Sequence, residues 1–166
     1  AVESLQPHID RMQRQARLLQ RIRPGAQLAA GNFFPLQAFE LDSLELLDKE
    51  VFGPILHVIR YRGDRLDAVV DAVNATGYGL TLGVHSRIED TWQRVKVRAR
   101  VGNLYINRNM IGAVVGVQPF GGEGLSGTGP KAGGPLYLYR FATERTCSEN
   151  TAAMGGNTGL LSLPDT

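Results

Sequence analysis

Hydrophobic residues recur at helical spacing in three segments of this chain, with polar residues between them. Such spacing places one apolar stripe along each helix and turns it towards a core. It predicts helices from about Ile9 to Arg23, from Asp64 to a stop at Gly77, and from about Glu89 to Arg100. The residues expected to face inward are Ile9, Met12, Ala16 and Leu19 in the first helix, Leu66, Val69, Val70 and Val73 in the second, and Trp92 and Val95 in the third.

Short runs of apolar and β-branched residues lie between these helices and after the third. The strands predicted from them are 33–35, 38–41, 55–61, 80–85 and 103–107. Asp42-Ser43 is expected to cap a short helix through Leu47. Strands and helices alternate from residue 55 to residue 107, which is typical of a parallel sheet covered by helices. The predicted fold class is therefore α/β.

The segment from Gly112 to Pro135 is dense in glycine and has little apolar periodicity. A loop of this length inside a domain is usually functional or disordered, and the apolar Pro119 and Phe120 indicate that part of it packs. Leu136 to Thr146 alternates again with β-forming residues, which predicts a strand. The chain therefore divides into a body at residues 1–135, a strand at 136–147 and an extended tail at 148–166.

The composition is typical of a globular domain with a sizeable core: 166 residues, 43% hydrophobic and 20% charged. A formal net charge of +2 is too small to imply nucleic acid as a partner. The early basic cluster is interpreted as a solvated helix face; its members are Arg11, Arg14, Arg17, Arg21 and Arg23. No apolar run approaches the roughly 20 residues that span a bilayer. The first residue is Ala1 rather than methionine, which is compatible with an excised domain but is also found where the initiator methionine has been removed before a small residue.

Cys147 is the only cysteine, so no disulfide framework can form within the chain, which suits a reducing compartment. A reactive thiol needs a base or a helix N-terminus beside it, and the neighbours Thr146 and Ser148 supply neither. We interpret Cys147 as structural or incidental. The histidines are scattered without metal-ligand spacing, so no metal site is predicted, and His57 in its apolar strand is interpreted as a packed core residue.

The run from Gly122 to Gly127 has the formal spacing G-x-G-x-x-G. A dinucleotide fingerprint needs a helix to open from this loop, but the glycines and prolines from Gly129 to Pro135 disfavour one. A phosphate-binding P-loop also fails, because Pro130 separates Gly129 from Lys131. Backbone N–H groups of such a loop could instead bind a carboxylate. Composition alone favours a plain surface loop.

An acid and an aromatic residue stand two apart at Glu50 and Phe52, followed by a Gly-Pro turn. In a strand they would share one face. The carboxylate could then accept hydrogen bonds from ribose hydroxyls while the aromatic ring packs on a flat ligand. A strand entry with a core phenylalanine explains the run equally well.

Several motifs, in order, resemble the aldehyde dehydrogenase superfamily. They are Glu50–Pro54, Asn74–Val84, Gly102–Asn107, Pro119–Gly122 and Ser126-Gly127, within a region from about Gly31 to Thr146. Residues 107–122, 136–141 and 155–157 are similar in particular to the L-glutamate γ-semialdehyde (pyrroline-5-carboxylate) dehydrogenase module of bifunctional proline utilisation A flavoenzymes. The resemblance implies that residues 1–135 are the C-terminal part of an aldehyde dehydrogenase catalytic domain and that 136–147 is an oligomerisation strand.

The same resemblance implies two binding regions. Glu50 would bind the nicotinamide ribose of NAD, and Phe52 would pack beside the nicotinamide. Gly112 and Ala113 would hold the substrate carboxylate through backbone N–H groups, and Phe120 would line the aldehyde pocket. It further implies glutamate semialdehyde as substrate, FAD in a proline dehydrogenase module if the parent is bifunctional, a homo-oligomer formed through residues 136–146, and a cytoplasmic parent that can associate peripherally with the inner membrane.

The chemistry of this family needs a thiolate nucleophile, a general base and a dinucleotide-binding fold. In the family these lie upstream of the matching region, and Cys147 corresponds to none of them. No catalytic residue is therefore predicted, and the chain is expected to be inactive alone. The alternatives are a non-catalytic oligomerisation or interaction module, a stand-alone nucleotide-binding domain, and another aldehyde dehydrogenase branch.

Overall fold

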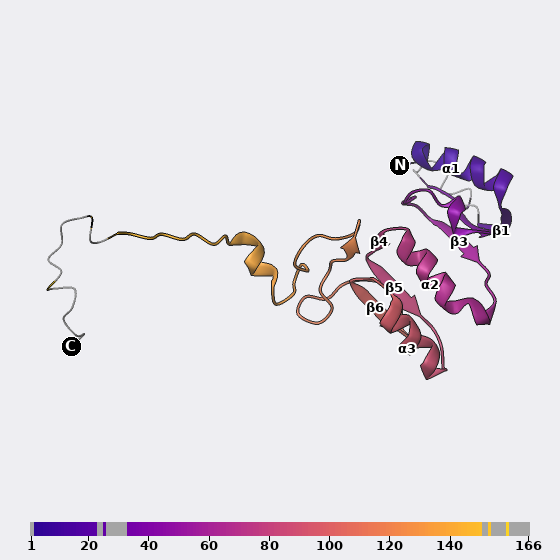
Figure 1. The fold of residues 1–166 in the computed structure, drawn as a ribbon. Coiled ribbons are helices and arrows are strands. Elements are labelled where there is room, and N and C mark those ends of the chain that lie inside the picture. Colours follow the sequence, from indigo (N-terminus) through magenta and orange to yellow (C-terminus); the bar gives the residue numbers. More distant parts are fainter. Residues whose placement is uncertain (1, 23–24, 26–32, 151–152, 154–158, 160–166) are drawn as a thin grey trace.

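The computed structural model describes residues 2–22, 25, 33–150, 153 and 159. Figure 1 shows two neighbouring groups of elements and an extended segment: α1 with β1 to β3 at one end, α2 and α3 with β4 to β6 beside them, and residues 142–150 running away from both. Within the described residues the strands form three separate small sheets. Two contain parallel pairs and both groups are covered by helices, which confirms the α/β class.

The first group packs one helix on a three-stranded sheet. The strands are β1 (Arg17–Ile22), β2 (Leu36–Leu41) and β3 (Ile55–Ile59), and α1 (Val2–Gln15) provides the helix. β2 lies in the middle, antiparallel to β1 and parallel to β3. Every second residue of β2 is buried, as expected when one face of a sheet meets a helix. The core consists of Ile9, Met12, Phe39 and Leu41.

The first predicted helix is wrong at both ends. Helix α1 begins at Val2 and ends at Gln15, and residues 17–22, predicted to be helical, form β1 instead. The residues of β1 are mostly good helix formers, so local propensity favoured the wrong element. Pairing with β2, which satisfies the backbone of both strands, decides the conformation. Ile9, Met12 and Ala16 nevertheless belong to this core or pack against it.

The early arginines consequently do not share one helix face. Arg11 lies on α1 and binds Asp48 at 2.9 Å, whereas Arg17 lies on β1 and binds Glu40, which also accepts from Arg60 at 2.5 Å. The hydrogen bonds from Arg17 and Arg60 lower the pKa of Glu40. Arg11 does the same for Asp48. Part of this cluster therefore tethers surface elements to one another.

The second group follows the predicted strand and helix order. Its elements are η3 (Gly63–Arg65), α2 (Leu66–Ala75), β4 (Tyr78–Gly79), β5 (Thr81–Val84), α3 (Glu89–Arg98), β6 (Asn103–Ile106) and β7 (Glu123–Gly124). β5 and β6 are parallel, and β4 pairs with β7 in antiparallel fashion. Leu66, Val70 and Val95 form the buried cluster between the helices and this sheet. Ion pairs Asp67–Arg94 and Asp71–Arg98 join α2 to α3 across their exposed sides.

Two short predictions near the first sheet have different outcomes. Ser43 caps the 3-10 helix η2 (Leu44–Leu46), with its hydroxyl accepting from the N–H of Glu45 at 3.2 Å, as the Asp42-Ser43 pair predicted. The strand predicted at 33–35 is wrong, because β2 begins only at Leu36. Pro35 has no N–H for a ladder, which disfavours a continuous strand at this point.

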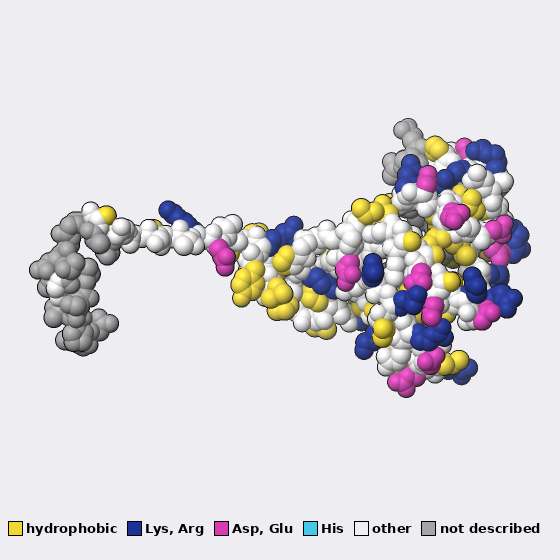
Figure 2. Space-filling view, in the orientation of Figure 1, with side chains coloured by type: hydrophobic (Ala, Val, Ile, Leu, Met, Phe, Trp, Pro, Cys, Tyr) yellow, Lys and Arg dark blue, Asp and Glu magenta, His cyan; other side chains and the backbone are white. Residues whose placement is uncertain are grey.

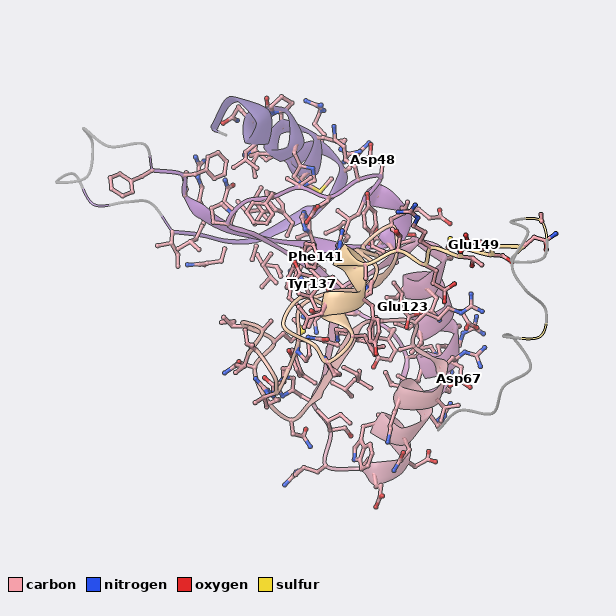
Figure 3. The ribbon with its side chains drawn as sticks, turned by 90° about the vertical axis from the view of Figure 1, so that its left-hand side faces the viewer. Asp48, Asp67, Glu123, Tyr137, Phe141 and Glu149 are labelled. Atoms are coloured by element: carbon pink, nitrogen blue, oxygen red, sulfur yellow. The ribbon has the colours of Figure 1, made fainter. Side chains whose placement is uncertain are left out.

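The strand predicted at 136–147 does not form in the single chain. Residues Tyr137–Phe141 form a 3-10 helix, η4, and residues 142–150 have no regular structure. Figure 3 shows Tyr137 and Phe141 on η4, where their rings meet edge to face at 5.4 Å. A strand needs a partner to satisfy its N–H and C=O groups, and no strand of the described residues pairs with this segment. Hydrophobic side chains gather openly there in Figure 2; those of Leu136, Leu138, Tyr139 and Phe141 are exposed.

A pair of histidines joins α1 to the sheet. The Nε2 atoms of His8 and His57 lie 2.9 Å apart, and Nη2 of Arg11 lies 3.4 Å from Nδ1 of His8. Because Arg11 can only donate, the arrangement fits a neutral His8 that donates from Nε2 to His57. His57 is half-buried and His8 is buried, so the interpretation of His57 as a packed residue is confirmed and its partner is added.

This pair should make the fold sensitive to mild acid. The pKa of His8 lies below its usual 6.5, mainly because the side chain is buried and next because Arg11 is positively charged. The pKa of His57 is also lowered, mainly by burial and next by the charges of His8 and Arg11. Asp48 opposes the shift of His8, and Lys49 adds to it. The unfolded chain therefore binds more protons below about pH 6.5. The free energy of unfolding should be highest above that pH and should fall as the pH drops towards the lowered values.

We expect His57→Gln, which keeps a hydrogen-bond acceptor but cannot titrate, to weaken this pH dependence. The hydrogen bond itself is worth about 1 kcal/mol, so the loss at neutral pH should be small. Urea unfolding midpoints measured from about pH 5 to about pH 7.5 provide the test. The exposed His85, changed to glutamine, is the matched control and should leave the profile as in wild type. Equal pH profiles for His57→Gln and wild type would contradict the role of the pair.

Candidate functional site

The residues expected to bind the cofactor lie on an irregular segment before β3. Glu50 and Phe52 are both exposed, and the ring of Phe52 is 90% exposed. They are not in a strand, so the shared strand face envisaged for them is wrong, although both do face solvent. The N–H of Gln37 donates to the carbonyl oxygen of Pro54 at 3.2 Å, which anchors the end of this segment to β2. The carboxylate of Glu50 and the ring of Phe52 are therefore accessible to solvent, on a segment whose backbone is bonded to β2 at Pro54.

Gly53 shows how closely this segment approaches α1. A Cβ atom at this position would lie 2.7 Å from a methyl carbon of Leu5. Leu5 is buried, with 5% of its surface exposed. Helix α1 and its neighbouring strands thus set the position of Glu50 and Phe52, and side chains at residue 53 are restricted by packing.

The residues expected to bind the substrate lie on the long loop that follows β6. Gly112 has a positive φ of 83°, with open space around a Cβ position, so its conformation and not its packing favours glycine. The backbone N–H groups of Gly112 and Ala113 make no hydrogen bond to a described residue. Phe120 is half-exposed and exchanges two backbone hydrogen bonds with Ala132, of 3.0 and 2.7 Å. Two free donors and a partly exposed ring therefore lie on one anchored loop.

Two side chains of β6 lie against this loop and were not foreseen. The hydroxyl of Tyr105 donates to the carbonyl oxygen of Gly112 at 3.3 Å. The Nδ2 atom of Asn103 donates to the same hydroxyl at 2.9 Å and to the carbonyl oxygen of Pro119 at 3.2 Å. Asn103 and Tyr105 stand two apart in a strand and so share a face. The sequence did contain a signal for this network, because Asn103 and Tyr105 are two polar residues at alternate positions of an otherwise apolar strand.

Lys131 completes this network from the far side of the loop. Its Nζ donates to the carbonyl oxygen of Gly102 at 2.7 Å and to Oδ1 of Asn103. The residues around it also dock on the loop: the N–H of Gly116 donates to the carbonyl oxygen of Gly133 at 2.8 Å. The loop is therefore bonded to the β6 region through Lys131, and its two halves are bonded to each other through Gly116 and Gly133.

The G-x-G-x-x-G run does not form a dinucleotide fingerprint. Glu123 and Gly124 form β7 and pair with β4, and a turn follows, with the N–H of Gly127 donating to the carbonyl oxygen of Gly124 at 2.9 Å. In the described part of the chain no α-helix opens from this loop. The prediction that the run lacks the context of a nucleotide-binding fold is confirmed.

The two predicted binding regions stand on different groups of elements. Within the described residues, no hydrogen bond or ion pair joins Glu50 or Phe52 to the loop that carries Gly112, Ala113 and Phe120. In Figure 1 the loop lies beside β4 to β6, away from α1. The described hydrogen bonds and ion pairs therefore do not join the two regions to each other.

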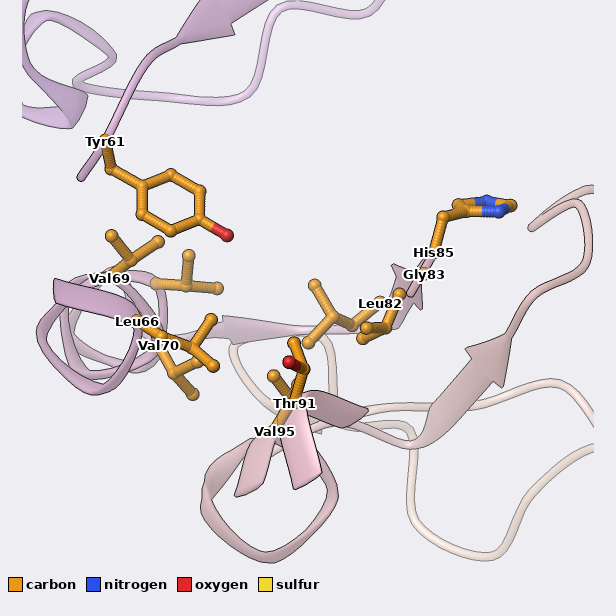
Figure 4. A pocket seen from close by; sticks show the side chains of 11 residues that line it. Tyr61, Leu66, Val69, Val70, Leu82, Gly83, His85, Thr91 and Val95 are labelled. Atoms are coloured by element: carbon orange, nitrogen blue, oxygen red, sulfur yellow. The ribbon is translucent and has the colours of Figure 1, made fainter. Parts of the chain in front are cut away.

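A separate apolar cavity of about 220 Å³ lies between α2, the start of α3 and β5 (Figure 4). Valine and leucine side chains form most of its wall, and Tyr61 and His85 stand at its edge. None of the predicted binding residues lines it.

Other kinds of site find little support in the described part of the chain. No group of three or more His, Cys, Asp or Glu residues is arranged there to hold a metal ion. No helix among the described residues is long and apolar enough to cross a membrane. Cys147 is exposed, in the irregular segment after η4, and makes no hydrogen bond to a described base.

Comparison with known proteins points to one family. Residues 1–147 match the model of the aldehyde dehydrogenase family. The chain is 57% identical over 150 residues to the bifunctional protein PutA of Klebsiella aerogenes, covering 87% of this chain and 11% of that protein. It is 44% identical over 104 residues to a 1-pyrroline-5-carboxylate dehydrogenase of Bacillus pumilus, covering 63% of this chain and 20% of that enzyme.

A solved structure agrees with these matches. The crystal structure of a mutant of Bradyrhizobium japonicum proline utilization A is similar with a TM-score of 0.80 and 59% identity, over 91% of this chain and 15% of that one. The chain thus spans only about a ninth of the length of the PutA protein of Klebsiella aerogenes. Similarity in both sequence and fold extends across the elements that carry the two predicted binding regions.

Proposed function

The chain belongs to the aldehyde dehydrogenase family, and on that premise we propose that it forms part of the catalytic domain of an NAD-dependent enzyme that oxidises L-glutamate γ-semialdehyde to L-glutamate. One observation carries the proposal. The chain matches both bifunctional PutA proteins and proteins named 1-pyrroline-5-carboxylate dehydrogenase. The shared part is therefore the dehydrogenase portion, and its substrate would be pyrroline-5-carboxylate or the semialdehyde that this ring opens to give.

The long loop supplies what a substrate with a carboxylate requires. The N–H groups of Gly112 and Ala113 are exposed and are not used by described residues. Consecutive free N–H groups can bind an anion without a charged side chain. Phe120, half-exposed on the same loop, offers an apolar wall for the methylene groups of the substrate. These features support recognition of a short aldehyde that ends in a carboxylate.

The segment before β3 suits the nicotinamide end of NAD. Glu50 is exposed and makes no hydrogen bond or ion pair with a described residue, so its carboxylate is free to accept from ribose hydroxyls. Phe52 leaves nearly its whole ring open for contact with a flat group. When bound, NAD would supply the acceptor for the hydride that leaves the substrate. The chain's residues would bind and orient it.

The described residues place no activating group beside Cys147, the only cysteine of the sequence. Cys147 is exposed on an irregular segment, and no described histidine or carboxylate lies in hydrogen-bond contact with it. A thiol without such a neighbour is a poor nucleophile. We therefore place the reactive thiol and the pyrophosphate-binding fold on polypeptide outside this chain, in a longer protein that includes FAD if it also carries a proline dehydrogenase module.

Residues 136–146 would assemble the enzyme. Most of their apolar side chains are exposed, and the backbone of residues 143–146 makes no hydrogen bond to a described residue. Such a segment can gain its missing hydrogen bonds by joining the sheet of a second copy. The proposed partner is therefore another molecule of the same protein, and the segment would become a strand only in that assembly.

The proposal is tested by comparing the 166-residue chain with the longer protein that contains it. The chain alone is expected to give no NADH from pyrroline-5-carboxylate and NAD, because no thiolate is available to form the covalent intermediate. The longer protein should give NADH, and faster from glutamate semialdehyde than from pentanal, which lacks the carboxylate. Turnover by the chain alone would refute the assignment of the thiol. Equal rates with both aldehydes would favour another branch of the family.

A further inference from the structure

The hydrogen bonds beneath the substrate loop run in one fixed direction. Lys131 has only donors, so the side chain of Asn103 must turn its oxygen towards it. The Nδ2 atom of Asn103 then faces the hydroxyl of Tyr105 and donates to it. Since that hydroxyl is already an acceptor, its single proton is left for the carbonyl oxygen of Gly112. The ammonium group of Lys131 and the carbonyl oxygens of Pro119 and Gly112, which can only accept, thus all require the same direction for these hydrogen bonds.

This last bond orients the peptide that follows Gly112. In a trans peptide the C=O of one residue and the N–H of the next point in opposite directions. Because the carbonyl of Gly112 is turned inward to Tyr105, the N–H of Ala113 is turned outward. It makes no bond to a described residue and belongs to an exposed residue. The outward N–H is one of the two donors proposed to hold the substrate carboxylate.

Tyr105 itself is held rigidly. It is 5% exposed, and the guanidinium carbon of Arg108 lies 4.4 Å from the centre of its ring. A buried hydroxyl held by both a donor and an acceptor has little freedom to rotate. Its position is therefore suited to fix a backbone group, and its phenol is enclosed rather than offered to a ligand.

We propose that Tyr105 is a positioning residue for carboxylate binding: it holds the Gly112–Ala113 peptide with its N–H outward, and Lys131, through Asn103, holds the Tyr105 hydroxyl in place. This rests on the proposed function, in which that peptide binds the substrate. The loop has other anchors, such as the bonds between Phe120 and Ala132, so losing the hydroxyl should change one peptide and leave the loop docked.

The first test needs no activity. In the 166-residue chain, Tyr105→Phe should lower the NMR order parameters of the Gly112 and Ala113 amides from rigid values to below about 0.6, while Phe120 stays rigid. Lys131→Met should act in the same direction through Asn103. Tyr139→Phe, whose ring is exposed and makes no hydrogen bond to a described residue, is the matched control. Unchanged order parameters in Tyr105→Phe would overturn the positioning role.

The second test measures recognition of the carboxylate in the longer protein. Tyr105→Phe should lower kcat/KM for glutamate semialdehyde about fivefold to tenfold, mainly through KM, as the loss of one hydrogen bond predicts. The kcat/KM for pentanal, which lacks a carboxylate, should not change. An equal loss with both aldehydes would indicate a structural role and overturn the proposal. A wild-type protein that does not prefer the semialdehyde would instead refute the proposed function, whatever the NMR result.

Discussion

Replacing Phe39 by alanine is expected to remove about 3 to 5 kcal/mol of the free energy of unfolding. Phe39 lies at the centre of β2 with no exposed surface, in one cluster with Ile9 and Met12 of α1. The change leaves a cavity where helix and sheet meet, and the neighbours can fill it only in part. Because typical domains have only about 5 to 15 kcal/mol in all, the first group of elements should unfold at least locally.

The consequence reaches the cofactor segment. Gln37 of the same strand holds the end of that segment through Pro54, so loss of α1 packing should release Glu50 and Phe52 as well. Urea unfolding followed by circular dichroism measures the loss. Phe52→Ala deletes the same atoms from a ring that is 90% exposed and is the matched control, with no expected change in stability. Similar unfolding midpoints for the two variants would contradict the assigned core.

Gly102→Ala is expected to undock the middle of the substrate loop, at Gly121 and Gly122, at a cost of about 3 kcal/mol. A Cβ atom there would overlap the carbonyl oxygen of Gly121 and lie 2.6 Å from the Cα atom of Gly122. Both obstacles are backbone, so no side-chain rotation can relieve them. The loop must move away from β6, and the bond from Lys131 to the carbonyl oxygen of Gly102 should be lost with it.

Limited proteolysis of the loop, together with urea unfolding, measures this change. The variant should be cut faster within residues 108–131. Helices α2 and α3 should keep their helical signal, because they pack with Leu82 and Leu104 on the face of the β5–β6 sheet that is opposite to the loop. Gly63→Ala is the matched control, since nothing lies within 4 Å of its Cβ position. A loop as resistant in Gly102→Ala as in wild type would show that the close backbone contact is not needed.

The two helices of the second group show where sequence reasoning succeeds. Leu66 and Val70 of α2 and Val95 of α3 are buried, as their spacing predicted. Gly77, the expected stop, has a positive φ of 78°, the conformation that ends many helices. Here local pattern and tertiary packing agree, because each helix carries its own complete apolar stripe.

Residues 17–22 and 136–146 show where it fails. Both have patterns compatible with two conformations, and the choice depends on whether a strand partner is available. For 17–22 the partner is β2, whose paired residues lie further along the chain, from Leu36 opposite Ile22 to Glu40 opposite Arg17. For 136–146 no strand of the described chain is within reach, so a 3-10 helix and an irregular segment result.

By itself the sequence determined the α/β class, the order of elements from residue 55 to 107, and the presence of a long glycine-rich loop, because helical stripes, strand composition and glycine density are local properties. Only the tertiary structure showed that Lys131, Asn103 and Tyr105 act on Gly112 as one network. Lys131 and Asn103 are 28 positions apart. Hydrogen bonds between such distant residues depend on how the chain folds back, and no periodicity along the sequence encodes that pairing.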